Sequence, residues 1–175
     1  PMSSRRLAEP DSPSDTMTSV RIYIPATSAD VSKEDLLPRL VHAVTRELEH
    51  AMPAEGEEVL ESVAMGAAAD DSLRILTALA QGGETIRPLR VVVVADVADS
   101  RVEPVSGDDL LPTARRLVRP VGWDAVASIH VDDDEALEDL LAAIGGDEQA
   151  FERVADEDLM WYDVEEREDL IAYFG

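Results

Sequence analysis

The stretch that decides the fold is Leu89-Arg-Val-Val-Val-Val-Ala95, which contains four consecutive valines. Apart from Arg90 it is apolar at successive positions, whereas a strand with one wet face alternates apolar and polar residues. It is far shorter than the roughly 20 apolar residues that a membrane-spanning helix needs. The stretch therefore predicts a central strand that is covered on both faces.

The segments around this strand predict the layers that cover it. Val20–Ile24 alternates as a strand does, and Glu57–Ala80 places its apolar residues at helical spacing before Gln81-Gly82-Gly83. Shorter patterns predict a helix begun by a capping box at Ser32 and Asp35 and a helix at 46–51 capped by Thr45. A long acidic loop is expected at 96–112. The remaining patterns predict strands at 115–121, 128–132 and 159–163, and helices at 133–144, 147–155 and 168–174.

These elements indicate an α+β fold, with a mixed sheet of about five strands and helices packed on it. We expect a single domain at residues 19–175, because no linker divides the pattern. Residues 1–18 are polar and rich in Pro, which is the composition of a disordered tail.

Composition excludes several classes of protein. The chain has 175 residues, 38 of them acidic and 15 basic, for a net charge of −23, and it has no Cys. The missing thiols exclude disulfides and thiolate chemistry. The negative charge argues against nucleic acid and anionic membranes and favours a basic protein partner. With no secretory signal and no spanning segment visible, we expect a cytoplasmic protein.

Several segments resemble, by their order and spacing, an uncharacterised family of soluble proteins from GC-rich Gram-positive bacteria, classed as a domain of unknown function. The segments are Arg21-Ile-Tyr-Ile-Pro25, His42-Ala-Val-Thr45 with Leu48, Val91–Val97, Trp123–Asp132 and Asp158–Tyr162. The resemblance covers about residues 20–171 and implies a strand-rich frame with a long Ala-rich helix. It implies no activity, ligand or catalytic residue.

Acidic residues follow two predicted strands and suggest a metal site. Asp96 ends the valine strand, and Asp132 and Asp134 follow the apolar pair Ile129 and Val131. Carboxylates at strand ends can hold Mg²⁺, although acidic residues there also cap the next helix. His130 could act as a general base beside Asp132 or Asp163, or could be a structural histidine held by hydrogen bonds.

Two further clusters could bind a partner. Trp161 and Tyr162 are neighbours in a predicted strand, so one should face the core and the other the opposite side. Arg115 and Arg116 form a basic cluster that could pair with the acidic C-terminal segments or receive an anionic ligand.

Two functions from different classes follow. We favour a non-enzymatic interaction or regulatory protein that needs no cofactor and whose acidic surface selects basic partners. The alternative is a Mg²⁺-dependent enzyme acting on a phosphorylated or other anionic small molecule, with Asp96, Asp132 and Asp134 as ligands and His130 as base. The enzyme requires these side chains to converge in one pocket. The sequence does not predict an oligomeric state.

Overall fold

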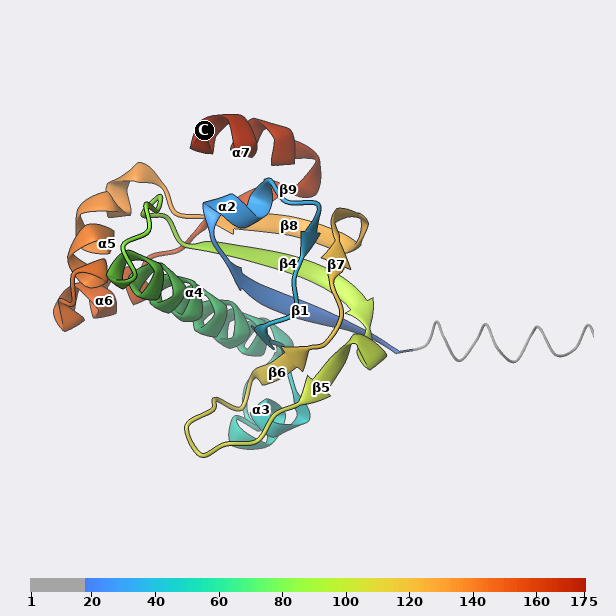
Figure 1. Ribbon diagram of the computed structural model, residues 1–175. Helices are drawn as coiled ribbons and strands as arrows, with labels where there is room; N and C mark the ends of the chain where they lie inside the picture. Colours follow the sequence, from blue (N-terminus) through green and yellow to red (C-terminus); the bar gives the residue numbers. More distant parts are fainter. Residues whose placement is uncertain (1–17) are drawn as a thin grey trace, which may run out of the picture.

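The computed structural model describes residues 18–175. Its main element is a seven-stranded sheet in the order β5-β6-β3-β1-β4-β8-β9, in which all neighbouring strands are antiparallel (Figure 1). The strands are β1 (Ser19–Ala26), β3 (Leu40–His42), β4 (Val91–Ala98), β5 (Val102–Pro104), β6 (Ala114–Leu117), β8 (Val126–Val131) and β9 (Met160–Asp163). A separate two-stranded sheet joins β2 (Asp35–Leu36) to β7 (Val121–Gly122).

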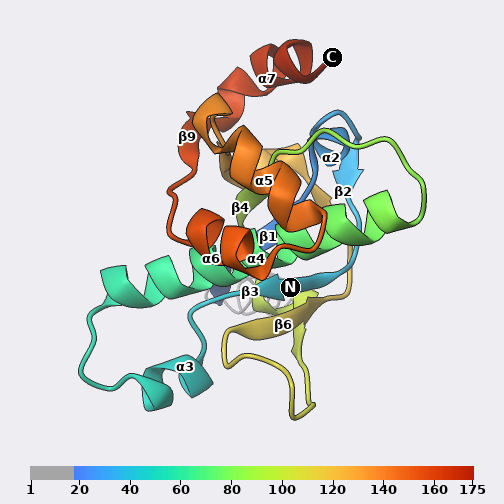
Figure 2. The same ribbon diagram turned by 90° about the vertical axis from the view of Figure 1, so that its left-hand side faces the viewer.

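Helices cover both faces of the sheet. The α-helices in residues 18–175 are α2 (Ser28–Val31), α3 (Arg46–Ala51), α4 (Glu57–Gln81), α5 (Leu137–Ile144), α6 (Glu148–Ala155) and α7 (Arg167–Phe174), with short 3₁₀ turns at 99–101, 123–125, 134–136 and 164–166. Figures 1 and 2 show α4 on one face, with α5 and α6 beside it, and α2 and α7 on the opposite face.

The valine strand is covered on both sides, as its composition predicts. On one face Val92 and Val94 of β4 pack with Tyr23 against Ala64 and Ala68 of α4. On the other face, Val91 and Val93 join the core that includes Val31 of α2 and Leu170 of α7. Small alanine side chains allow the long helix α4 to approach the sheet closely. The distance between α4 and the sheet sets the depth of any hollow on this face of the sheet.

The α+β class is confirmed, but two details of the predicted sheet are wrong. The sheet has seven strands rather than about five, and it is antiparallel rather than mixed. The additional strands are short. One of them, β5, lies in the segment expected to be a long acidic loop, where three residues pair with β6.

The helix predicted from Ser32 is also wrong. The helix is α2, whose capping box lies five residues earlier in the chain, where the Thr27 backbone N–H donates to the Asp30 carboxylate at 3.0 Å. Arg39 also donates to Asp30, at 3.1 Å. The chain then continues into β2 and β3, and Pro38 between them is incompatible with a helix interior.

The described residues bear only in part on two expectations, the disordered tail and the absence of a membrane-spanning segment. The tail predicted at 1–18 lies, apart from its last residue, outside the described residues. Within residues 18–175 no helix combines the length and the apolar character needed to cross a bilayer.

Candidate functional site

A groove of about 430 Å³ lies on the α4 face of the sheet, between α4 and the outer strands β8 and β9. The segment 155–159, which connects α6 to β9, forms one of its walls. The residues that determine its chemistry are Tyr23, Glu61, Arg90, Ser128, His130 and Trp161.

The strand register explains why these side chains share one face. His130 of β8 lies opposite Val92 of β4 and opposite Trp161 of β9. Directly paired residues of antiparallel strands point to the same side of a sheet. Since Val92 packs against α4, His130 and Trp161 also face the α4 side. On the helix, Gly66 leaves open space, because a Cβ atom there would meet nothing within 4 Å.

Two arginines of the groove are already neutralised. Arg90 is 1% exposed and donates to both oxygens of Asp132, from Nε at 2.9 Å and from Nη2 at 2.7 Å. Its backbone N–H donates to the same carboxylate at 2.8 Å. Arg21 donates in the same bidentate manner to Asp96 at 2.9 Å, but this pair is about half exposed.

Four acidic residues around the groove have no such neutralisation. We call Glu58, Glu61, Glu157 and Asp158 the groove carboxylates. Within residues 18–175, none of the four forms an ion pair. Because both groove arginines have partner aspartates, the groove has a net negative charge and favours a cationic ligand.

The floor of the groove is polar but uncharged near neutral pH. Burial lowers the pKa of His130 to about 4, so its ring is neutral. One ring nitrogen, Nε2, lies 2.9 Å from the Ser128 hydroxyl. Burial, together with the nearby charge of Glu61, raises the pKa of Tyr23 to about 12. Perturbed titratable groups gathered in a hollow are typical of functional sites.

Trp161 is the most exposed large apolar side chain of the described residues, at 61%. Its neighbour Met160 is 46% exposed, while Tyr162 points to the other face and packs against the core there. The structure therefore agrees with the expectation that one residue of the Trp161–Tyr162 pair faces the core.

The structure does not bring the three candidate metal ligands together. Asp96 pairs with Arg21, Asp132 pairs with Arg90, and Asp134 accepts a hydrogen bond from the Tyr173 hydroxyl at 2.8 Å. Arg90, the partner of Asp132, lies six residues before Asp96 along the same extended segment, a separation of about 20 Å at 3.3 Å per residue. Within residues 18–175 no group of three acidic or histidine side chains could hold a metal ion.

His130 is not paired with either aspartate considered as its partner. The hydrogen bond of its ring is to Ser128, and the Asp132 carboxylate is fully engaged by Arg90. A general base works best with a pKa near the operating pH. A ring with a pKa of about 4 is a weak base, so the arrangement suits hydrogen bonding rather than proton abstraction.

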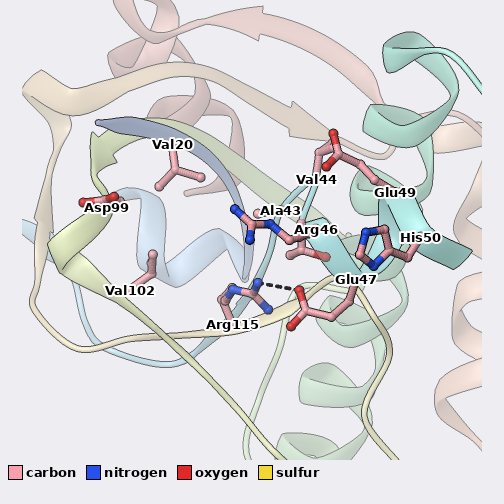
Figure 3. Close-up of a pocket in the computed structure, with 11 residues that line it drawn as sticks. Val20, Ala43, Val44, Arg46, Glu47, Glu49, His50, Asp99, Val102 and Arg115 are labelled. Carbon is pink, nitrogen blue, oxygen red and sulfur yellow. Dashed lines mark hydrogen bonds and ion pairs between the residues drawn. The ribbon is translucent and has the colours of Figure 1, made fainter. Parts of the chain in front are cut away.

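The basic cluster lies on the other half of the sheet. Arg115 of β6 donates to Glu47 of α3 at 2.8 Å and not to the acidic C-terminal segments, because β6 and β9 are separated by four strands. Figure 3 shows this pair at a hollow of about 710 Å³, which Arg46, Glu49 and Asp99 also line. Its charges are mixed, and Arg116 is exposed outside it, so the hollow has no clear preference for an anion.

Sequence reasoning missed a buried histidine cluster. Thr113 Oγ1 lies 2.7 Å from His42 Nδ1, and Asp71 Oδ2 lies 2.6 Å from His42 Nε2. The order hydroxyl, imidazole, carboxylate is that of a catalytic triad, but Thr113 is 1% exposed and its hydroxyl is closed to a substrate. The cluster connects β3 and the segment before β6 to α4.

Sequence reasoning also missed the floor of the groove, including Tyr23 and Ser128. One signal was available: Arg90 interrupts an apolar strand, and a buried charge requires a partner. Asp132, at the end of another apolar strand, was a candidate partner.

The fold and the groove define an α+β domain with an acidic hollow beside an exposed tryptophan. The chain belongs to a family of unknown function, DUF6912, whose model matches residues 20–171. This confirms the resemblance to a domain of unknown function, while the Gram-positive origin stays a prediction. Comparison with curated proteins and with solved structures gave no match.

Proposed function

We propose that this protein is a non-enzymatic binding module that holds a basic segment of a protein partner in the groove between α4 and β9. The observation that carries the proposal is the exposed Trp161 beside the groove carboxylates. The proposal retains the regulatory role and the cytoplasmic location expected from the sequence.

The chemistry of the groove favours an arginine or lysine side chain. A carboxylate attracts the charged end of such a side chain, and an indole face attracts a cation by about 0.5–2 kcal/mol. The long aliphatic stem of either residue can lie along Trp161 while its charged end reaches the carboxylates. An anion would instead meet net negative charge.

The charge of the whole chain strengthens this selectivity. From His130 to Gly175 the sequence has 17 acidic residues and two basic ones, Arg153 and Arg167. This part of the chain contributes β9 and the segment 155–159 to the groove. A field of one sign attracts oppositely charged partners and increases their rate of association, more strongly at low ionic strength.

The test is binding of a fluorescently labelled octa-arginine peptide to the full chain, measured by anisotropy. The groove variant is Glu157→Gln with Asp158→Asn, and the matched control is Glu84→Gln with Asp108→Asn. All four residues are exposed, and both variants change the net charge by the same amount. Two exposed charge contacts at about 0.5–1 kcal/mol each predict a loss of roughly fivefold to thirtyfold for the groove variant.

We expect the control variant to remain within about twofold of the unchanged chain, because distant exposed charges are screened. A second comparison uses Trp161→Ala against Leu111→Ala, since Leu111 is 51% exposed on a loop outside the groove. Equal losses in the groove and control variants would show non-specific attraction to a polyanionic surface and would refute the proposal.

A further inference from the structure

The two edge strands of the large sheet differ in their capacity to accept another strand. At one edge, β5 has three residues and ends in Pro104, which has no backbone N–H to donate. At the other edge, β9 has four residues, Met160 to Asp163, and no proline, although the Asp163 backbone N–H already donates to Glu166 Oε2 at 2.8 Å. Within residues 18–175, no strand pairs with the outer side of β9. Figure 2 shows β9 at an outer margin of the molecule.

Residues near the β9 edge are exposed on both sides of the sheet. Trp161 is 61% exposed on the α4 side, beside the groove, and Met160 is 46% exposed on the opposite side. Edge strands are usually protected by proline, charge or a covering element. Within residues 18–175, no element covers Trp161 or Met160 enough to bury it.

We infer that the basic segment binds as an extended strand added to the outer edge of β9. This inference rests on the proposed function, because it uses the same groove and the same charge preference. Main-chain hydrogen bonds to β9 groups other than the Asp163 N–H, which already donates to Glu166, hold the segment. The alternate side chains of the segment distinguish the two sides of the sheet.

The register of β9 sets the pattern of the segment. A residue beside Trp161 points to the α4 side, where the groove carboxylates Glu157 and Asp158 lie, so it should be arginine or lysine. The next residue points to the side of Met160 and Tyr162, so it should be apolar. The segment is thus an alternation of basic and apolar residues over at least four positions.

Charge decides between a basic segment and a second copy of this chain. Pairing of two β9 edges would place two sets of groove carboxylates near one another, on molecules that each have a net charge of −23. Like charges at an interface oppose association. A basic segment removes this repulsion and replaces it with attraction.

The test uses the full chain and two capped octapeptides of identical composition, one alternating Arg and Val and one with four Arg followed by four Val. Backbone N-methylation is then introduced at all Arg or at all Val positions of the alternating peptide. In a strand, the N–H groups of alternate residues point to the same side, so one methylation pattern removes donors facing β9 and the other does not.

We expect the alternating peptide to bind at least about fivefold more tightly than the block peptide, because only the alternating one places all its arginines on the α4 side. One methylation pattern should weaken binding about tenfold or more, and the other should change it by less than about threefold. Trp161→Thr should weaken binding of the alternating peptide, whereas Leu111→Thr should not.

The outcomes separate the two levels of the proposal. If both methylation patterns leave the affinity of the peptide equally unchanged, strand addition is overturned. Binding that still depends on Glu157 and Asp158 would in that case support the groove as the binding site. Absence of binding by either peptide, or binding that ignores those two carboxylates, overturns the proposed function as well. A dimer in sedimentation velocity that the alternating peptide does not dissociate overturns the basic segment in favour of a second copy.

Discussion

Two arginine–aspartate pairs in this chain have the same chemistry and differ in burial. Arg90–Asp132 and Arg21–Asp96 are both bidentate, with donor–acceptor distances of 2.7–2.9 Å. The side chains of the first pair are 1% exposed, and those of the second are 48% and 44% exposed. Asp132→Asn and Asp96→Asn are therefore a matched test of what burial adds.

Asp132→Asn should be strongly destabilising. The remaining oxygen can still accept from the backbone and Nε of Arg90, but the new amide group faces the Nη2 donor of Arg90 and leaves a buried charge without a counter-ion. Breaking a buried pair in this way costs about 3–5 kcal/mol. The exposed Arg21–Asp96 pair should contribute about 0–1 kcal/mol.

The assay is urea unfolding followed by far-ultraviolet circular dichroism, with thermal melting as a second measurement. At about 2–4 °C per kcal/mol for a domain of this size, Asp132→Asn should lower the Tm by about 6–20 °C. Asp96→Asn should lower it by no more than about 4 °C. Equal losses for the two variants would refute the reasoning from burial.

A double replacement shows whether the loss comes from the unpaired charge. Arg90→Met combined with Asp132→Leu removes both charges and should recover part of the stability, because the buried backbone N–H at position 90 still loses its acceptor at 2.8 Å. It also removes the 3.3 Å hydrogen bond from Arg90 Nη2 to the Glu157 carbonyl, so one groove wall loses a support. The double variant should fold and yet bind the octa-arginine peptide less tightly.

Four other aspects of the chain give testable expectations. Val93→Asp should prevent folding, because Val93 is fully buried and an unpaired charge there costs several kcal/mol of a total of about 5–15 kcal/mol; a soluble variant with a cooperative melt would contradict this. A chain that begins at Met17 retains all of β1 and should melt at the temperature of the full chain. Since burial lowers the pKa of His130 from 6.5 to about 4, the unfolded chain binds this proton more readily, so stability should fall as pH drops from about 6.5 towards 4. His130→Asn should flatten that part of the urea-midpoint profile. Sodium chloride should raise the Tm smoothly by screening the repulsion between acidic side chains. Magnesium at matched ionic strength should raise the Tm no further. A saturable rise with magnesium that is lost in Asp134→Asn would contradict this expectation.

Local signals in the sequence predicted the elements whose ends are set by nearby residues. Thr45 caps α3 by accepting from the Leu48 backbone N–H at 3.0 Å, and α3 begins at Arg46, the residue expected. The long helix α4 also has nearly the predicted bounds. Caps, helical spacing and a terminal glycine act within a few residues, so one sequence contains all the necessary information.

Elements that depend on distant partners could not be predicted in this way. The strand β5 has three residues and exists because β6, ten residues further on, pairs with it. The capping pattern at Ser32 and Asp35 resembles the true one at Thr27 and Asp30, and tertiary contacts such as Arg39 to Asp30 favour the latter. Short strands have weak local signals, which is why the sheet exceeds the predicted number.

The same limitation applies to the candidate site. Asp132 after an apolar strand is compatible with a metal ligand, a helix cap or a salt bridge, and the choice depends on Arg90, 42 residues away. The exposure of Trp161 rather than Tyr162 likewise depends on which face of β9 meets the core. Sequence reasoning therefore identified Trp161, Tyr162 and His130 as candidates without showing that Trp161 and His130 share a groove.

In the proposed binding mode, the acidic surplus accounts for both the selectivity of the groove and the protection of the β9 edge against unwanted pairing. An exposed strand such as β9 is a hazard, because any extended chain can pair with it. At β5, Pro104 reduces this hazard by removing a donor, but it does so for every partner equally. In the proposed binding mode the groove carboxylates act selectively, because like charge repels acidic chains, including other copies of this protein, and opposite charge attracts basic ones. If β9 accepts basic segments as proposed, charge protects this edge better than proline would, because charge still admits a basic partner and this chain has acidic residues beside β9.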